Sequence, residues 1–246
     1  MLIDSVENKR KILKNFLEIV AVSGWNKSSL HEALKKSSID HKFLPLIFPN
    51  NLLDLADFYV EENNEILQQK IAKITDFDHQ KIRDKIRFCL YQRFVLEQKN
   101  KSAISALSHY YFDPKNLFNF EVGFRPKIQA LKNCFKIADE IWRLINDQST
   151  DFNFYTKRLT LAKIILQTIP VFLKDEDSEL SKTKKFIDSK IEKVMQFEKL
   201  KFKTKEAGTN LVNFLQSSLL NSDSSFKKPS QIIKNLPFIR LFKDKF

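Results

Sequence analysis

The sequence predicts an all-α protein, and three observations support this fold class. Apolar residues recur at spacings of three and four along most of the 246-residue chain, as they do on one face of a helix. Glycine occurs only three times, and alternating runs of β-branched residues are absent, whereas sheet proteins need both tight turns and such runs. A chain of this length can bury an ample core as one large domain or two small ones.

Four helices are predicted at the start of the chain. The first covers residues 9–22 and ends at Gly24, after which Asn26 can cap a second. A short third helix is expected over 39–48, and a fourth after Pro49. The residues expected to face inward are Ile12, Leu13, Phe16, Ile19 and Val20; Leu30, Ala33 and Leu34; and Leu52, Leu55, Ala56, Tyr59 and Val60.

Two helices, a short third one and then F-P-x-x-x-L form the order of a TetR-type helix-turn-helix domain, which we assign to residues 1–62. A DNA-reading third helix should offer polar side chains to base edges, but beyond His41 and Lys42 this one is apolar. We expect Pro45 to interrupt it, since proline inside a helix costs ~3 kcal/mol or more. DNA binding is therefore not expected, and a ligand-responsive TetR-type transcriptional regulator is the alternative function.

The helical pattern continues over 61–73, and further helices are predicted at 79–98, 102–111 and 127–145, from Phe154 to Leu173, and after Ser178. Together they define a larger helical domain over 63–198. Their predicted inward residues are Ile82, Ile86, Cys89, Leu90 and Phe94; Ile128, Leu131, Phe135, Ala138, Trp142 and Ile145; Leu159, Ala162, Leu166, Ile169 and Leu173; and Phe186, Ile187, Ile191, Val194 and Phe197. Several helices wrapped together can leave an internal apolar cavity. The candidates to line it are Phe88, Phe94, Phe135, Ile165 and Phe172.

The net charge of +12 does not by itself indicate a nucleic-acid partner. Arginine supplies only eight of the 42 basic residues, although nucleic-acid readers depend on its bidentate contacts. A chain rich in Lys, Asn, Ile and Phe is also typical of a genome low in G and C. An anionic membrane is as plausible a partner as nucleic acid.

No motif recommends catalysis, so the chain is expected to be neither an enzyme nor the holder of a cofactor or metal. The four histidines lie in separate segments, and H-E-x-x-H, E-x-x-H, G-x-S-x-G, P-loop and G-x-G-x-x-G patterns are missing. Cys89 and Cys134 form no C-x-x-C pair. The acidic run Asp175-Glu176-Asp177 is expected to be a solvated turn rather than a metal site.

The first ten residues carry Asp4 and Glu7 and lack an apolar core, so no secretory or organelle leader is expected. No uninterrupted apolar run approaches the ~18 residues of a membrane span. These two observations predict a cytoplasmic protein that is at most peripheral to a membrane.

The stretch from Asp139 to Arg158, DEIWRLINDQSTDFNFYTKR, is the most informative part of the chain. Helical spacing ends at Asn146, a polar turn follows, and a second helix opens with an aromatic pair and two basic residues. Ser149 or Asp151 is expected to cap that second helix, and Trp142 is expected in the core. The purely structural alternative is a well-capped helical hairpin.

The residues D-x-I-W-R, then D-Q-S-T-D-F-N-F-Y-T-K-R and then L-x-x-A resemble the signature of the ubiquinone-biosynthesis accessory family often called COQ-nine. The resemblance is tight over 139–191 and looser before, where G-W-N-x-x-x-L-x-x-A at 24–33 and S-A-I-S-A-L also match. One departure is Phe154, where the family usually carries Trp.

This resemblance implies a TetR-like, non-catalytic homodimer that binds an isoprenoid or quinone lipid in the cavity of its larger domain. It further implies that the protein presents a polyprenyl quinone intermediate to the di-iron demethoxyubiquinone hydroxylase, at the surface of the inner membrane. The docking surface is then expected at the turn, with Asp147, Ser149, Thr150, Asp151, Phe154, Tyr155 and Arg158.

Residues 199–246 form a basic amphipathic tail in which lysines are interleaved with apolar residues. The tail lies where the family has a C-terminal amphipathic helix associated with membrane docking, and basic residues among aromatics suit a bilayer interface. Its alternative role is to pack on its own domain or on a second subunit. The residues expected to bind the membrane are Lys203, Leu211, Phe214, Leu215 and Leu219.

Overall fold

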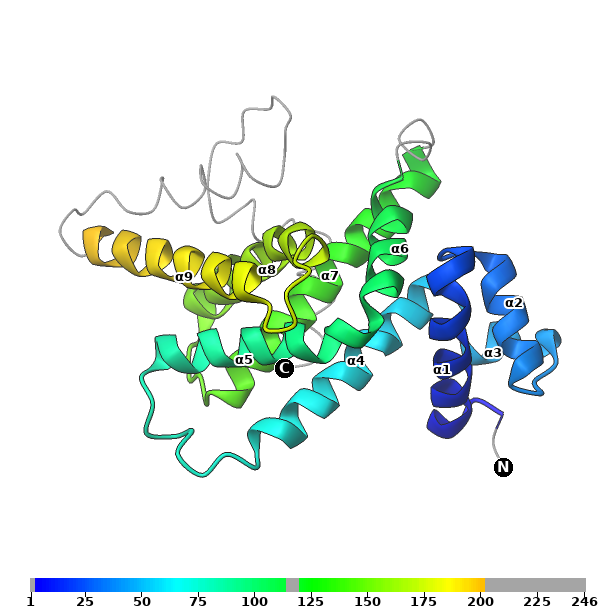
Figure 1. Ribbon diagram of the computed structural model, residues 1–246, viewed down its shortest axis with the longest axis horizontal. Helices are drawn as coiled ribbons and strands as arrows, with labels where there is room; N and C mark the ends of the chain where they lie inside the picture. The colour runs from blue at the N-terminus through cyan, green and yellow to red at the C-terminus, as the bar shows by residue number, and fades with distance from the viewer. Residues whose placement is uncertain (1–2, 114–119, 202–246) are drawn as a thin grey trace. The chain divides into compact units, whose positions relative to one another are not determined.

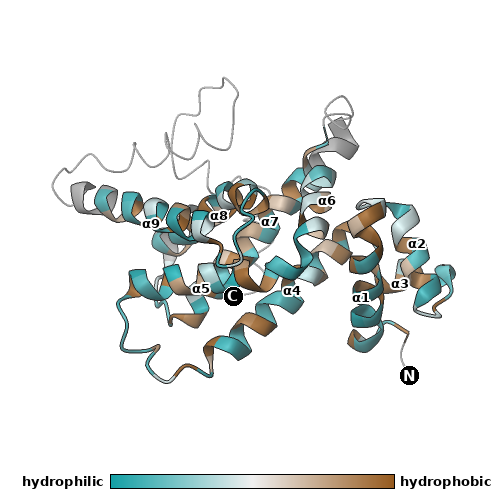
Figure 2. Ribbon diagram, viewed as in Figure 1, coloured by the Kyte–Doolittle hydropathy of each residue, from teal (hydrophilic) through white to brown (hydrophobic). Residues whose placement is uncertain are grey.

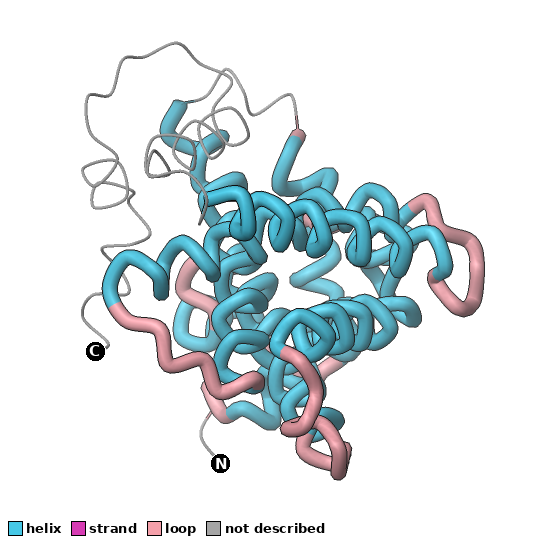
Figure 3. Tube along the Cα trace, turned by 90° about the vertical axis from the view of Figure 1, so that its left-hand side faces the viewer, coloured by secondary structure: helices cyan, strands magenta, loops and turns pink. Residues whose placement is uncertain are grey.

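The structure is a computed structural model, and it describes residues 3–113 and 120–201. Every regular element within these two ranges is helical, as Figure 3 shows, which confirms the predicted all-α class. The chain divides into two compact units, Met1–Asp188 and Ser189–Phe246. The membrane-binding prediction for residues 203–219 lies outside the described residues.

The N-terminal helices follow the predicted order (Figure 1). Helix α1 (Val6–Ser23) buries all five of its predicted inward residues and ends at Gly24, whose φ of 79° is a backbone conformation that suits glycine. Helix α2 (Lys27–Lys36) is capped by Asn26, whose side chain accepts a hydrogen bond from the backbone N–H of Ser29 over 2.9 Å. The sequence therefore predicted both the helix stop and the cap correctly.

The third element is shorter than predicted. It consists of a 3-10 turn, η1 (His41–Phe43), and a four-residue helix, α3 (Leu44–Ile47). The expectation that Pro45 interrupts a regular helix was wrong, because Pro45 lies in the first turn of α3, where its missing N–H has no helical partner to lose. One helical turn, with Leu44 and Ile47 buried, leaves little to insert into a DNA groove.

The remaining helices complete the described part of the first unit, and the last of them continues into the second unit. They are α4 (Leu52–Ile71), α5 (Ile82–Glu97), the 3-10 turn η2 (Gln98–Asn100), α6 (Lys101–Phe112), α7 (Phe120–Leu144), α8 (Asp151–Leu173) and α9 (Ser181–Lys201). The predicted boundary at residue 62 falls inside α4, and the division into domains stays a prediction.

Helix α7 is the centre of the first unit, since it packs against α8, α4, α6 and α5. Phe135 and Ile141 of α7 are fully buried, as are Leu67 of α4 and Leu90 of α5. Figure 2 shows hydrophilic and hydrophobic residues alternating around these helices, as amphipathic faces require. Burial of these faces against one another supplies most of the stability of such a unit.

The predicted inner faces need correction in several helices: Ile128, Leu131, Phe186 and Val194 are half-buried, and the side chain of Phe197 lies outside the described residues. Ile82 is 61% exposed, because it is the first residue of α5 and lies outside the buried face formed by the residues that follow. In α8 the deepest residues include Ile165 and Phe172, whereas Leu166, Ile169 and Leu173 are half-buried. Helix α8 contacts both α6 and α7, so residues around a large part of its circumference are buried. Its buried residues therefore do not form one narrow row along the helix.

The acidic turn before α9 is less solvated than predicted. Asp175 is 1% exposed, and its Oδ2 accepts hydrogen bonds from the backbone N–H and the hydroxyl of Thr183, each over 2.7 Å. Asp175 therefore ties the turn to the first turn of α9. Within the described ranges there is no cluster of His, Cys, Asp and Glu able to hold a metal ion, and no helix is long and apolar enough to cross a membrane.

Candidate functional site

A buried network of charges holds the turn between α7 and α8. Arg158 of α8 donates from Nε to Oδ1 of Asp139 in α7 over 2.5 Å, and from Nη1 to Oδ2 of Asp147 in the turn over 3.2 Å. Lys157 donates to Asp147 over 2.7 Å, and Ser149 donates to the same carboxylate over 2.5 Å. We name Asp139, Asp147, Ser149, Lys157 and Arg158 the turn cluster.

The turn cluster fixes the turn between α7 and α8 through side chains that are mostly buried. Arg158 and Asp147, both predicted in the docking surface, have buried side chains: Arg158 is 2% exposed and the side chain of Asp147 is 6% exposed. Burial acts to raise the pKa of Asp147, but the hydrogen bonds from Lys157 and Ser149 outweigh it, and the pKa lies below its ordinary value of 3.8. Asp147 is therefore held as a carboxylate.

The predicted helix cap was wrong. Thr150 is the N-cap residue of α8, and its side chain makes no capping hydrogen bond. The hydroxyl of Ser149 donates to Asp147 instead, and Asp151 is already the first residue of the helix. The turn cluster thus replaces an ordinary side-chain cap as the interaction that fixes the start of α8.

Phe154 and Tyr155 lie half-buried at the edge of the turn cluster. The guanidinium carbon of Arg158 is 3.4 Å from the centre of the Phe154 ring, and Tyr155 meets that ring edge-on with 5.2 Å between ring centres. Trp142 is buried, as predicted, with Nζ of Lys157 5.0 Å from the centre of its ring. The ring of Phe154 is therefore held by a buried cation, and Tyr155 packs on that ring. Both rings remain partly open to solvent, and Thr150 is exposed.

Helices α4 to α8 enclose a small apolar cavity of about 80 Å³, which we name the interior cavity. Of the five predicted lining residues, Phe94 and Ile165 line it. Phe88 packs on Phe77 of the α4–α5 loop, Phe172 packs on Phe94, and Phe135 is part of the core of α7. Sites for small ligands usually measure ~300–1,000 Å³, so this cavity accepts only part of a lipid.

Sequence reasoning missed the polar groups of the interior cavity. Arg93 and Glu97 of α5 line it and form a buried ion pair, and the hydroxyl of Tyr59 donates to Glu97. A signal was present in the sequence, because Arg93 and Glu97 continue the apolar stripe of Ile86 and Leu90 at helical spacing. Charged residues on the buried face of a helix indicate a polar network or a site.

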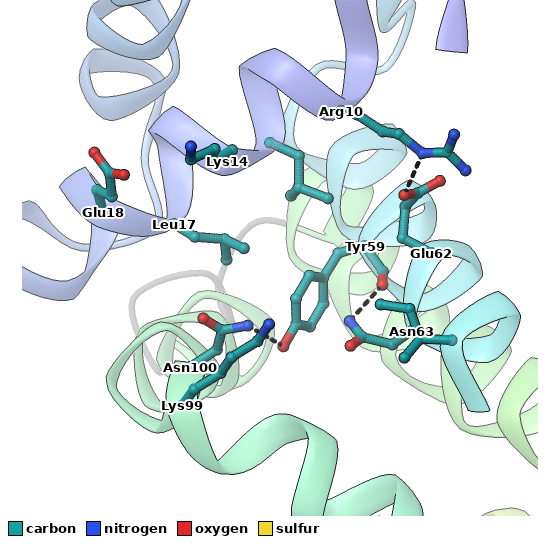
Figure 4. A pocket seen from close by; sticks show the side chains of 11 residues that line it. Arg10, Lys14, Leu17, Glu18, Tyr59, Glu62, Asn63, Lys99 and Asn100 are labelled. Atoms are coloured by element: carbon teal, nitrogen blue, oxygen red, sulfur yellow. Dashed lines mark hydrogen bonds and ion pairs between the residues drawn. The ribbon is translucent and has the colours of Figure 1, made fainter. Parts of the chain in front are cut away.

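Two open hollows on the surface adjoin the interior cavity. The first, about 520 Å³, lies between α1, α4 and η2 and includes Tyr59, whose hydroxyl accepts a hydrogen bond from Asn100 (Figure 4). The second, about 960 Å³, lies between the end of α1 and α6, and we name it the α6 hollow. Ser108 and Phe112 line both the α6 hollow and the interior cavity.

The fold and the site together define an all-helical protein with an internally fixed inter-helix turn and a small apolar cavity. In the comparison with known proteins, residues 128–198, which include the whole turn cluster, match the COQ9 family model. The chain carries the COQ9 domain, which confirms the family resemblance predicted from residues 139–158.

Relatives extend the similarity beyond that domain. The chain is 26% identical over 220 residues to a "Probable ubiquinone biosynthesis protein coq9, mitochondrial" of Dictyostelium discoideum, covering 85% of this chain and 67% of the relative. It is 23% identical over 217 residues to the rat "Ubiquinone biosynthesis protein COQ9, mitochondrial", covering 85% and 66%, and 21% identical over 215 residues to the human protein, covering 85% and 64%. The chain thus spans about two thirds of the length of these relatives.

Proposed function

We propose that this chain is a non-catalytic accessory protein of ubiquinone biosynthesis. In this proposal it binds an isoprenoid lipid, a polyprenyl quinone intermediate, and presents it to the demethoxyubiquinone hydroxylase at a membrane surface. The observation that carries the proposal is the turn cluster inside the COQ9 domain, which holds Phe154 and Tyr155 partly open to solvent. The names of the relatives supply the pathway.

The geometry of the turn suits a docking surface better than a simple reversal of the chain. Aromatic residues are frequent anchors at the centres of protein interfaces. Anchors that are already rigid lose little side-chain entropy on binding. Phe154 is rigid because it rests on Arg158, which is in turn fixed by Asp139 and Asp147. We propose Phe154, Tyr155 and Thr150 as the partner-facing residues.

The lipid is proposed to enter the interior cavity, whose lining is largely apolar. The cavity is smaller than a whole lipid, so most of an isoprenoid chain must lie elsewhere. The α6 hollow, which shares Ser108 and Phe112 with the cavity, offers that space. Association with an anionic membrane through the tail, and a homodimeric state, remain part of the proposal.

A binding measurement with the hydroxylase of the same organism tests the docking surface. Phe154→Ala should weaken the affinity by about 30-fold, since central aromatic anchors contribute ~2 kcal/mol or more. Asn153→Ala is the matched control, because Asn153 is an exposed neighbour in the same turn of α8. Unchanged affinity of the Phe154 variant, or an equal loss in the control, would overturn the assignment of the turn as the docking surface.

A further inference from the structure

Two of the three guanidinium nitrogens of Arg93 have no hydrogen-bond partner within the described part of the protein. It is 2% exposed, and its Nη1 donates to Glu97. Among the described residues, its Nε and Nη2 have no hydrogen-bond partner. Buried donors of a charged group are seldom left unpaired, because they have lost their hydration without gaining a partner. A hydrogen-bond acceptor from outside the chain would satisfy these two groups.

Asn133, Tyr111, Tyr59 and Glu97, which also line the interior cavity, form hydrogen bonds within the protein. Asn133 donates to the hydroxyl of Tyr111 over 2.8 Å, and the hydroxyl of Tyr59 donates to Glu97. The rest of the lining is largely apolar, with Phe94, Leu107 and Ile165 among its members. Within the described residues, Arg93 is the lining residue whose buried side-chain nitrogens lack a partner, so it can still donate to an oxygen atom.

The charge of the pair decides which kind of oxygen it can bind. Arg93 is balanced by Glu97, so the pair carries no net charge. An anionic head group would bring an uncompensated charge into an apolar space, which is strongly unfavourable. An uncharged acceptor, such as a carbonyl or an ether oxygen, gains the hydrogen bonds without that penalty.

We propose that Arg93 binds an uncharged carbonyl or ether oxygen on the head group of an amphiphile, and so selects quinone-like heads over carboxylates. This inference rests on the proposed lipid-binding function and names the part of the lipid that enters the interior cavity. At about 80 Å³ the cavity is roughly half the size of a cavity that encloses a benzene ring, so it receives the oxygen-bearing edge of a head group.

The chain of the amphiphile leaves past Ser108 and Phe112, which line both spaces. Phe112 is 47% exposed, so its ring borders the solvent as well as the cavity. The α6 hollow beyond it, with Trp25, Ala106 and Leu173 in its wall, accommodates the hydrocarbon.

Three probes with the same ten-carbon chain on a six-membered ring test the proposal by calorimetric titration. They are a decyl-substituted dimethoxybenzoquinone, decylbenzene and 4-decylbenzoate. The wild-type protein should bind the quinone about tenfold or more tightly than either of the other two, as expected for hydrogen bonds to a charged donor.

The test variant is Arg93→Met combined with Glu97→Gln. It removes both charges together, which buried pairs tolerate better than the loss of one partner, and it keeps an acceptor for Tyr59. The variant should bind decylbenzene as the wild type does and lose the preference for the quinone. Arg10→Met with Glu62→Gln is the matched control, because this pair, 2.6 Å apart, lines the first hollow and not the interior cavity or the α6 hollow, and it should keep the preference.

The outcomes separate the two proposals. If the wild type binds none of the three probes, lipid binding at this cavity fails and the role of Arg93 fails with it. If the wild type binds quinone and decylbenzene equally, or prefers 4-decylbenzoate, lipid binding stands and the assignment of Arg93 is overturned. The wild-type comparison decides this even if the double variant does not fold.

Discussion

Nε of Arg158 in α8 lies 2.5 Å from Oδ1 of Asp139 in α7, so one guanidinium joins the two helices on either side of the turn. The same side chain reaches Asp147 in the turn and supports the ring of Phe154. Stability of the hairpin and presentation of the aromatic pair therefore depend on one residue. Variants of the residues around Arg158 can separate its effect on stability from its effect on the position of Phe154 and Tyr155.

Arg158→Ala should destabilise the protein by ~3–5 kcal/mol, because it leaves Asp139 and Asp147 without their shared buried cation. Arg143→Ala is the control, since Arg143 pairs with the same Asp139 over 2.8 Å but its side chain is 56% exposed. It should cost ~0–1 kcal/mol. Urea unfolding of both variants measures the difference, and equal effects would show that the buried position of Arg158 has no special importance.

The turn cluster should also contribute to the dependence of stability on pH. The pKa of Asp147 is lower in the folded protein than its ordinary 3.8, so its contribution is complete well above that value and is lost as the pH falls through the folded pKa. Asp147→Asn should thus be less stable than wild type at about pH 7, and the gap should narrow below about pH 4. Thermal unfolding over this range measures the gap. A gap that stays constant down to about pH 2 would contradict the role of the carboxylate.

Phe154→Ala should lower the free energy of unfolding by only ~1 kcal/mol, the loss of a partly exposed cation–π contact. A core phenylalanine would cost ~3–5 kcal/mol. Phe135→Ala, at a fully buried position of α7, supplies that comparison within the same protein. If both variants lost equal stability in urea, Phe154 would be a core residue and its proposed part in docking would be lost.

Neither cysteine should react in the folded protein. Burial raises the pKa of Cys89 to about 12 and that of Cys134 to about 12, so both remain thiols near neutral pH. A disulfide reagent should label both only after unfolding in urea. Cys134 lines the interior cavity and Cys89 does not, so faster native labelling of Cys134 alone would show that the cavity opens readily to solvent.

The helices were predicted well because their apolar spacing, and the residues that start and end them, are local features of the sequence. The stop at Gly24 and the cap at Asn26 both depend on nearby residues and were correct. Pro45 was misjudged because its cost depends on where the helix starts, and that start is set by η1. The face of α8 was only partly predicted, since two packed neighbours bury a broad arc of it.

The candidate site was only partly predictable for a related reason. The turn was found because its residues are contiguous, but the division into buried supports and half-exposed rings depends on Asp139, one helix away. The Arg93–Glu97 pair was overlooked because the cavity that it lines is assembled from residues of five helices. Which phenylalanines line that cavity is likewise set by packing between distant segments, as the pairing of Phe172 with Phe94 shows.

Native mass spectrometry of the protein purified from ubiquinone-producing cells tests the central claim of lipid binding most directly. We predict an adduct whose mass and fragments identify an isoprenoid quinone or its biosynthetic precursor. The adduct should be depleted in the Arg93→Met, Glu97→Gln variant and retained in the Arg10→Met, Glu62→Gln control. Protein that carries no lipid, or carries only fatty acids and phospholipids in proportion to their abundance in the cell, would contradict the proposed function.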